Sequence, residues 1–410
     1  MKIATPSPKV ALLTGGIDKH YASGLWQTLA ALGLSIDVIC NPEMAPDQFS
    51  VPPNPRFLKL YASPEVHRSK TAKLLTFICV YLRLMLYAST ASAEVFHVLW
   101  NYRIPTFDRT ILLLYFKMLG KRVVFTAHNI NAAARDGVDS FLNRFTLRFQ
   151  YRNVDQIFVH TELMKRQLID LFGVREQKIS IIPFGTYNMV PQSSLTSAEA
   201  KKRLGLNQSD KAVLFFGRIA PYKGIDLLVN AFLQIASKNA QYRLIIAGEP
   251  MRDAQSQWRA VQVEIEQSTL AQSVIQHSRF IADDEIELYF KAADVLALPY
   301  TQIFQSGVLF MSYSFGLPVI GADVGSFADD IVDGETGFVC RPNDPEDLAR
   351  TIETYFCSDL FKKLDERRGR IRRSIGAIHS WDDAGRKTAE VYSFLARCKE
   401  LDSAPSAKPN

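Results

Sequence analysis

Short runs of apolar, mostly β-branched residues alternate with longer stretches of helical periodicity along almost the whole chain. This alternation is typical of a parallel sheet whose strands are joined by crossover helices, so we predict an α/β fold with strands covered on both faces. The strands predicted in the first half are 10–14, 36–40, 95–99, 123–126, 156–159 and 179–183. Those predicted in the second half are 212–216, 243–247, 295–298, 318–321 and 337–340.

The two series of strands predict two doubly wound, Rossmann-like domains, because 410 residues exceed what one core commonly holds. A polar stretch at 191–210 is the expected linker, which places the domains at 1–190 and 211–379. Ser380, followed by a tryptophan and two aspartates, is typical of a helix start and predicts a final helix at 380–398. The polar residues 401–410 are expected to be disordered.

Composition and charge narrow the class of protein. Hydrophobic residues make up 47% of the chain and charged residues 22%, which excludes collagen-like, wholly disordered and polytopic membrane proteins. The net charge of +6 is uneven: residues 1–190 have 22 Lys and Arg against 13 Asp and Glu, and the rest has 26 against 29. A basic first half favours an anionic substrate or surface there, and a merely solvated basic face is the alternative. The cations are not interleaved with aromatic residues as in nucleic-acid-binding modules, so no nucleic-acid partner is expected.

The cysteines and the N-terminus indicate a cytoplasmic protein. Cys40, Cys79, Cys340, Cys357 and Cys398 are odd in number and contain no C-x-x-C pair. This pattern favours a reducing compartment over a disulfide framework or a zinc site. The first residues lack the apolar core of a secretory signal, so we expect no export.

The most apolar run, 74–87, has two interpretations. It is 14 residues long, contains Arg83 and is shorter than the ~20 residues that span a bilayer. We favour a buried crossover helix. The alternative is a first domain that rests peripherally on an anionic membrane and reaches a lipid-linked acceptor. The cations near this run in the sequence are Lys70, Lys73, Arg83, Arg103, Arg109, Lys117, Lys121 and Arg122.

Ligands of doubly wound sheets bind outside the carboxyl ends of the strands, so the loops at those ends form the candidate site. The loop after the first strand contains Gly15 and Gly16, whose backbone N–H groups could approach a phosphate or sugar. It does not complete a G-x-G-x-x-G, so a dehydrogenase is not predicted. A later loop places His128 at a strand's carboxyl end, where it could hydrogen-bond a sugar hydroxyl or a transition-state oxygen. A structural histidine is the alternative.

Two loops of the second half have the chemistry of an anion site. Arg218 and Lys223 lie between a strand and a helix, where two cations beside a helix N-terminus would neutralise a diphosphate and the charge on a departing phosphate oxygen. The other loop leads into an apolar helix, so the free N–H groups of Ser306, Gly307 and Val308 would point at an anion. Exposed cations and a plain capped helix are the structural alternatives.

Several segments carry a resemblance to a known family. The second half contains, in order, VLFFGRIAPYKGIDLLVNAF, RLIIAGEP, FKAADVLALPYTQIFQSGVLFMSYSFGLPVIGADVGS and DGETGFVCRPNDPEDLARTI. The first half contains TAHNINAAARDG and FVHTELMKRQLIDLFGVREQKISIIPFG. Together they resemble glycosyltransferase family 4, the group 1 enzymes of GT-B fold, over roughly residues 10–395. The resemblance implies two Rossmann-like domains facing across a cleft, a final helix that crosses back to the acceptor-side first domain, and sugar transfer from a nucleotide-diphosphate sugar with retained anomeric configuration.

The resemblance also implies roles for individual residues. Arg218 and Lys223 would bind the donor diphosphate and His128 would contact the donor sugar, which makes these three the expected catalytic residues. No metal or other cofactor is expected, and the sequence has no D-x-D motif. The other donor-binding positions, of which 279–281 would line the nucleobase pocket largely through backbone groups, are Gly15, Gly16, Arg279, Phe280, Ile281, Gln305, Ser306, Gly307 and Val308.

One departure from the family concerns two glutamates, eight residues apart, that usually hold donor hydroxyls. Ile303 and Met311 occupy these positions, so both carboxylates are missing. Gln305, Ser306 and Gly307 are expected to supply neutral hydrogen bonds instead. Without a carboxylate nucleophile there, we favour a front-face mechanism in which the leaving phosphate deprotonates the acceptor hydroxyl.

The expected function is a metal-independent hexosyltransferase of cell-envelope or exopolysaccharide biosynthesis. It would move a sugar from a nucleotide-diphosphate sugar to a hydroxyl of a glycan or polyprenyl-linked acceptor, in the cytoplasm or peripherally on the inner membrane face. The missing glutamates favour the main alternative, a non-catalytic nucleotide-sugar-binding protein or partner subunit. A nucleotide-sugar epimerase of similar architecture is the third candidate.

Overall fold

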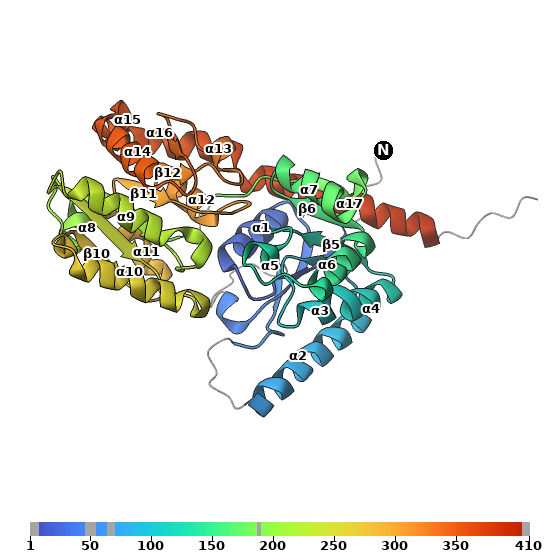
Figure 1. The fold of residues 1–410 in the computed structure, drawn as a ribbon. Helices are drawn as coiled ribbons and strands as arrows, with labels where there is room; N and C mark the ends of the chain where they lie inside the picture. Colours follow the sequence, from blue (N-terminus) through green and yellow to red (C-terminus); the bar gives the residue numbers. More distant parts are fainter. Residues whose placement is uncertain (1–7, 46–54, 64–69, 187–189, 404–410) are drawn as a thin grey trace, which may run out of the picture. The chain divides into compact units, whose positions relative to one another are not determined.

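The computed structural model describes residues 8–45, 55–63, 70–186 and 190–403 (Figure 1). Its contacts divide the chain into two compact units. Unit 1 comprises residues 1–134, 138–185 and 381–410, and unit 2 comprises 135–137 and 186–380. The stretch predicted as a linker thus folds with unit 2.

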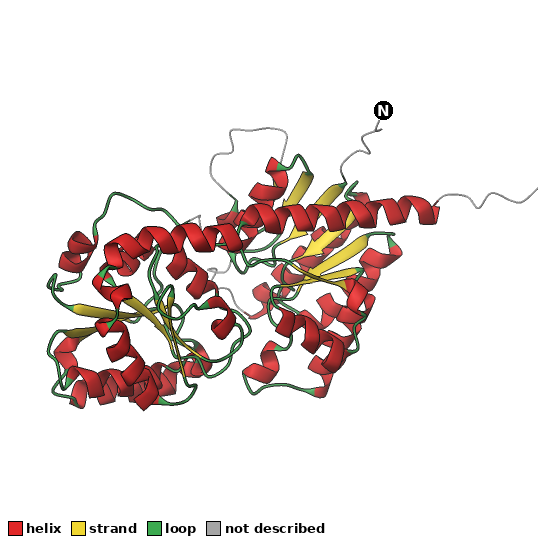
Figure 2. Cartoon of the chain, turned by 90° about the horizontal axis from the view of Figure 1, so that it is seen from above, coloured by secondary structure: helices red, strands yellow, loops and turns green. Residues whose placement is uncertain are grey.

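Unit 1 is built on a seven-stranded parallel sheet of order β3-β2-β1-β4-β5-β6-β7 (Figure 2). Its strands are β1 (Lys9–Leu13), β2 (Ser35–Ile39), β3 (Arg56–Leu58), β4 (Val95–Val98), β5 (Arg122–Thr126), β6 (Gln156–Val159) and β7 (Ile179–Ile181). The order reverses between β1 and β4, which is the switch point where doubly wound sheets bind ligands.

Helices cover the sheet of unit 1. The longer ones are α1 (Lys19–Ala31), α2 (Lys70–Thr90), α6 (Phe141–Asn153), α7 (Glu162–Phe172) and α17 (Trp381–Ser403). The shorter turns are η1 (Pro42–Met44), α3 (Pro105–Phe107), η2 (Asp108–Leu112), α4 (Leu113–Met118), α5 (Ala132–Arg135) and η3 (Glu176–Lys178). Residues 401–403, which we expected to be disordered, continue α17, and 404–410 lie outside the described residues.

Unit 2 repeats the arrangement with a six-stranded parallel sheet of order β10-β9-β8-β11-β12-β13. The strands are β8 (Lys211–Phe216), β9 (Tyr242–Ala247), β10 (Val274–His277), β11 (Val295–Leu298), β12 (Val319–Ala322) and β13 (Gly337–Cys340). The helices are α8 (Ser197–Arg203), α9 (Ile225–Ala236), α10 (Gln255–Gln267), α11 (Asp283–Ala292), α12 (Gly307–Ser314), α13 (Phe327–Asp330), α14 (Pro345–Cys357), α15 (Asp359–Lys362) and α16 (Leu364–Ile378), with short turns η4 (Pro221–Lys223), η5 (Arg252–Ala254) and η6 (Ala271–Ser273).

The sequence pattern misses one strand in each sheet, and both are edge strands. β3 and β10 lie at the same end of their sheets, beside β2 and β9. β3 has the sequence RFL and β10 the sequence VIQH, so neither is a continuous apolar run. An edge strand is paired on one side only and needs less apolar cover than the central strands that the pattern identifies.

The favoured interpretation of the apolar run 74–87, a buried crossover helix, is wrong in one respect. The run lies in α2, which does connect β3 to β4, but Leu74, Leu75, Ile78, Leu82 and Leu86 are 46–66% exposed. The window Thr71–Thr90 is 20 residues long, has a mean hydropathy of 1.4 and is 22% buried. By length and composition alone it qualifies as a membrane-spanning helix within the described part of the chain.

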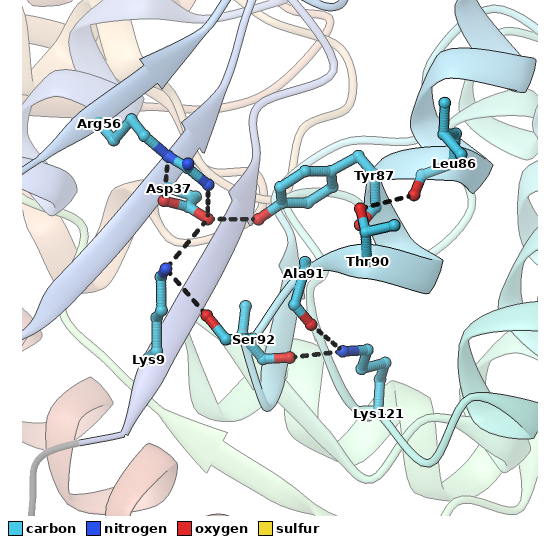
Figure 3. A network of polar contacts seen from close by, with 10 residues as sticks. Lys9, Asp37, Arg56, Leu86, Tyr87, Thr90, Ala91, Ser92 and Lys121 are labelled. Atoms are coloured by element: carbon cyan, nitrogen blue, oxygen red, sulfur yellow. Dashed lines mark hydrogen bonds and ion pairs between the residues drawn. The ribbon is translucent and has the colours of Figure 1, made fainter.

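A polar network attaches the C-terminal end of α2 to the sheet of unit 1 (Figure 3). The Tyr87 hydroxyl donates to Asp37 Oδ2 at 2.7 Å. Arg56 donates to both oxygens of the same buried carboxylate, at 2.9 and 2.7 Å, and Lys9 Nζ lies 3.9 Å away. Asp37 therefore joins β1, β2, β3 and α2 at one point.

A buried ion pair explains why the expected linker folds with unit 2. Lys201 on α8 donates to Asp294 Oδ2 at 2.9 Å and to the Asp210 carbonyl oxygen at 2.7 Å. Asp294, which directly precedes β11, also accepts the N–H of Ala212 at 2.8 Å. Both side chains are about 7% exposed, so either charge without its partner would be left in a poorly solvated place.

We predict that Asp294→Ala lowers the free energy of unfolding of unit 2 by about 3–5 kcal/mol, because Lys201 would lose its buried counter-ion. Chemical denaturation followed by tryptophan fluorescence or circular dichroism measures this free energy of unfolding. Glu353→Ala, which removes the exposed pair with Lys238, is the matched control and should change it by less than about 1 kcal/mol. Equal effects of the two variants would contradict the prediction.

Candidate functional site

The site in unit 2 is framed by loops at the carboxyl ends of β8 and β9, whose backbones touch. Gly217 has φ 92° and Gly248 φ 151°. A Cβ atom added at Gly248 would lie 2.1 Å from the Gly217 carbonyl oxygen, so a side chain there would force the two loops apart. Gly224 joins η4 to α9 at φ 65°, in the left-handed region that glycine adopts without strain. These glycines fix the shape of the loop that carries Arg218 and Lys223.

Lys223 is a buried cation without a carboxylate partner among the described residues. Its side chain is 7% exposed, and Nζ lies 5.5 Å from the centre of the Tyr300 ring. Nζ also lies close to Gly217, since a Cβ atom there would be 3.2 Å from it and 3.5 Å from Val308. Burial first, and then the charges of Arg218 and Arg135, together lower the pKa of Lys223 to about 7. A bound anion would raise the pKa of Lys223 again, because it favours the charged amine.

Further cationic and aromatic groups surround Lys223 within unit 2. Arg218 is exposed and forms no ion pair with a described residue. The guanidinium of Arg135 lies 4.0 Å from the centre of the Tyr222 ring, and its Nε is 2.7 Å from Asp136. The Tyr222 carbonyl accepts the N–H of Thr301 at 2.8 Å, which ties this loop to the one before α12. The predicted residues Arg218, Lys223 and Val308 thus gather around one spot.

A hydrogen bond attaches the loop before α12 to the start of α13. Ser326 donates its N–H to the Phe304 carbonyl oxygen at 3.1 Å and its hydroxyl to Asp330 Oδ2 at 2.6 Å. Burial raises the pKa of Asp330 to about 6, against the hydrogen bonds from Ser326 and Gln305. The Oε1 atom of Gln305 is buried and accepts no hydrogen bond, so it could accept one from a ligand.

The start of α12 presents free backbone donors. Ser306 precedes the helix in extended conformation, is buried, and makes no side-chain capping bond. Gly307 and Val308 form the first turn, where N–H groups have no partner within the helix. Ile303 is half-buried and Met311 is buried, and neither brings a carboxylate to this helix. The chemistry here is therefore neutral donors and positive charge, which suits a diphosphate.

The segment predicted to line the nucleobase pocket lies after β10. The guanidinium of Arg279 donates to Glu285 Oε2 at 2.7 Å, and its N–H donates to the His277 carbonyl oxygen at 2.9 Å. Phe280 is exposed and Ile281 is buried. Among the described residues, no hydrogen bond or ion pair joins this segment to Arg218 or Lys223. The Arg279 side chain and N–H are thus already engaged, and the exposed Phe280 forms no hydrogen bond through its side chain.

The predicted residues of unit 1 meet at Trp100, which follows β4. The imidazole of His128 stacks on Trp100 with ring centres 4.1 Å apart and 5° between planes. A Cβ atom at Gly15, which has φ 62°, would lie 2.7 Å from Trp100. Gly16 is less available than we expected, because its N–H donates to Thr14 Oγ1 at 3.3 Å.

His128 is neutral at physiological pH and keeps one nitrogen free. Burial, and then the neighbouring imidazoles of His160 and His97, lower its pKa well below the usual range. Nδ1 lies 3.3 Å from His160 Nε2, whereas Nε2 is buried without a partner. Tyr21 packs edge-on with ring centres 4.5 Å apart. This fixed ring with one unpaired nitrogen can hydrogen-bond a hydroxyl.

Sequence reasoning missed the groups that hold these residues. Trp100 follows a predicted strand at its carboxyl end, so the rule that identified His128 could have found it. Ser326 and Asp330 are four residues apart at a short helix, a spacing too common to single out. Arg135 belongs to unit 2 with the next two residues, although the chain before and after this short stretch belongs to unit 1, and no local sequence pattern predicts that.

Two family models cover most of the chain. "Glycosyltransferase Family 4" matches residues 15–186 and "Glycosyl transferases group 1" matches residues 210–357. D-inositol 3-phosphate glycosyltransferase of Acidothermus cellulolyticus is 30% identical over 242 residues, which are 58% of this chain and 53% of that protein. The matched part of the chain thus spans about half the length of this curated relative.

Solved structures share the fold at low sequence identity. Sucrose-phosphate synthase of Thermosynechococcus elongatus has a TM-score of 0.76 and 19% identity, over 95% of this chain and all of that one. Anabaena HepE in complex with UDP and glucose has a TM-score of 0.73 and 15% identity, over 94% and 100%. With its two parallel sheets, the chain has the GT-B fold.

We predict that binding of a nucleotide-diphosphate sugar takes up a proton above pH 7. The free Lys223 amine has a pKa of about 7 and is mostly neutral at pH 8, whereas the diphosphate favours its charged form and raises that pKa. Affinity should therefore fall, by up to about tenfold per pH unit above 7. Calorimetry at pH 8 in two buffers of different ionisation enthalpy measures the uptake, and Lys223→Met should abolish it. Proton release on binding, or unchanged uptake in that variant, would contradict the assignment.

Proposed function

Because the chain belongs to the glycosyltransferases that combine a Family 4 with a group 1 domain, we propose that it is a retaining hexosyltransferase. The donor is a nucleotide-diphosphate sugar bound by unit 2. The acceptor is a hydroxyl of a glycan or polyprenyl-linked glycan of cell-envelope or exopolysaccharide biosynthesis. The observation that carries this proposal is the buried, uncompensated amine of Lys223 beside Arg218 and the first turn of α12.

Positive charge that is in place before the reaction supports sugar transfer rather than donor binding alone. As the bond between the sugar and the diphosphate breaks, negative charge grows on the leaving phosphate oxygen. Cations and helix N–H groups that are already fixed stabilise that charge without reorganisation. We propose that Lys223, Arg218 and α12 do this without a divalent metal.

The reaction we propose proceeds on one face of the sugar. Ile303 and Met311 supply no carboxylate nucleophile, so a covalent sugar intermediate at these positions is not part of the mechanism. The leaving phosphate instead takes the proton of the acceptor hydroxyl, which attacks from the same side and retains the configuration. The free Nε2 of His128 hydrogen-bonds a sugar hydroxyl.

The first test uses UDP-glucose, because solved neighbours of the same fold bind UDP and UDP-glucose. We expect UDP-glucose to stabilise the protein thermally and to be turned over, with EDTA having no effect. Lys223→Met and Arg218→Ala should each lower turnover at least about 100-fold, because each removes charge that acts on the leaving group. Arg373→Ala, an exposed arginine of α16, is the matched control.

The outcomes separate the proposed function from its main alternative. Binding without turnover, for any nucleotide sugar and a range of acceptors, would favour the non-catalytic protein that the absent glutamates suggest. Isomerisation of the donor without an acceptor would favour an epimerase. Absence of binding to any nucleotide diphosphate would contradict both the enzyme and the non-catalytic donor-binding protein.

We also propose that unit 1 rests on an anionic membrane surface. Of the 22 large apolar side chains exposed in the described chain, 11 lie on α2, the turns from α3 to α4, and α6. The Tyr115 hydroxyl donates to the Met85 carbonyl oxygen, and Arg109 donates to Asn143, so these helices are neighbours. Apolar area next to positive charge is the combination that binds anionic bilayers.

The cations available to lipid are fewer than the sequence suggested. Lys117 and Arg122 pair with Asp155, and Lys121 is buried and donates to two backbone carbonyls. Arg109 is half-buried and donates to Asn143, and the side chain of Lys70 lies outside the described residues. Lys73, Arg83 and Arg103 remain, exposed and without an ion pair to any described residue. Three cations at about 1 kcal/mol each would assist the apolar helices rather than replace them.

We predict that Leu82→Asp at least halves binding to phosphatidylcholine vesicles with 30% phosphatidylglycerol. Leu82 on α2 is 61% exposed, so the charge should not disturb the fold but should oppose contact with lipid. Leu171→Asp, 58% exposed on α7, is the matched control and should leave binding unchanged. Vesicle sedimentation measures both, and equal binding of Leu82→Asp and wild type would contradict the proposed surface.

A further inference from the structure

A large cavity of unit 1 is lined by neither Gly15 nor His128, although its lining residue Tyr61 is hydrogen-bonded to the Gly15 backbone. Its volume is about 660 Å³, within the range of pockets that enclose a small-molecule ligand. One wall is the segment 59–63, which directly follows β3, and the opposite wall is the N-terminal half of α2. Tyr102 and Arg103, from the loop after β4, close a third side.

Positive charge is the chief chemical feature of this cavity. Lys59, Lys73, Arg83 and Arg103 all line it, and none of the described residues that line it is an aspartate or a glutamate. Within the described ranges, none of these four cations forms an ion pair with a carboxylate. Four cations from three separate segments thus surround one volume without a described carboxylate partner. Arginine pairs with phosphate in two-pronged geometry, so phosphate is the group this cavity fits best.

The rest of the lining is aromatic and held in place. The rings of Tyr61 and Tyr102 stack at 4.5 Å with 15° between their planes. The Tyr102 hydroxyl accepts the N–H of Ala62 at 3.2 Å, and the Tyr102 N–H donates to Asp108 Oδ2 at 2.7 Å. Tyr61 is 3% exposed, so Tyr102, which is half-buried, is the ring of this pair that a ligand can reach. Leu75 of α2, which is exposed, extends the lining toward apolar surface.

We infer that this cavity binds the phosphate of a phosphorylated acceptor. The inference rests on the proposed function, because it gives unit 1 the acceptor. Arg83 and Arg103 hold the phosphate, Lys59 and Lys73 neutralise its remaining charge, and Tyr102 contacts the adjoining group. The phosphate belongs either to a soluble sugar phosphate or to a polyprenyl phosphate whose chain follows α2.

The test compares the full-length chain with the double variant Arg83→Gln/Arg103→Gln. The soluble probe is glucose 1-phosphate, with glucose as its uncharged counterpart. The lipid probe is phosphatidylcholine vesicles with 5% polyprenyl phosphate, compared with vesicles holding phosphatidylglycerol of equal charge. We expect wild type to prefer at least one phosphate probe to its counterpart, and the variant to weaken that binding at least tenfold. Arg166→Gln/Arg175→Gln, which removes the same charge from exposed positions of unit 1, should not weaken it.

UDP binding, measured on the same samples, separates this inference from the proposed function. Both double variants should bind UDP as wild type does, which also reports that they are folded. Preference for glucose 1-phosphate identifies a soluble source of the phosphate, and preference for polyprenyl phosphate a lipid source; both support the inference. If wild type binds UDP but shows no preference for either phosphate probe, the inference fails and the proposed function stands. If it binds no nucleotide diphosphate at all, the proposed function fails first.

Discussion

Unit 2 is organised around a lysine that is kept from water without a counter-charge. Burying an ammonium group costs free energy unless something pairs with it, and the described neighbours of Lys223, which are loop glycines, Tyr300 and the first turn of α12, supply no carboxylate. The protein thus holds a group whose charge is most favourable only in the complex. In the proposed transfer, binding of the diphosphate and stabilisation of its growing charge both depend on Lys223.

The central parts of both units could be predicted from sequence, because a buried parallel strand must be a continuous apolar run. The six strands expected in the first half and the five in the second half all exist, within one or two residues of the predicted ends. The predictions failed for elements whose environment depends on segments far away in the sequence. β3 and β10 pair on one side only, and α8 reads as a polar linker until Lys201 meets Asp294, which is 93 residues away. The apolar pattern of α2 could not distinguish a helix that the core covers from one that it leaves exposed.

The candidate site likewise combines residues that the sequence predicts with supporting groups that it does not. Loop residues at strand ends were identifiable, because the topology of a doubly wound sheet fixes where ligands bind. Arg218, Lys223 and Val308 do gather, and Gly15 and His128 do meet at Trp100. The groups that set their chemistry come from elsewhere: His160 lowers the pKa of His128, and Asp330 supports the loop of Gln305. These contacts depend on packing between distant segments, and no motif encodes them.

The contact between Gly217 and Gly248 has a consequence for altering the enzyme's donor preference. Two loops that frame the proposed donor site are joined backbone to backbone, so libraries that randomise either glycine would consist mostly of misshapen sites. Ile303 and Met311 carry no such restriction of backbone angle, and they occupy positions where carboxylates could be introduced. Directed evolution should therefore begin at these two side chains and leave the glycine frame untouched.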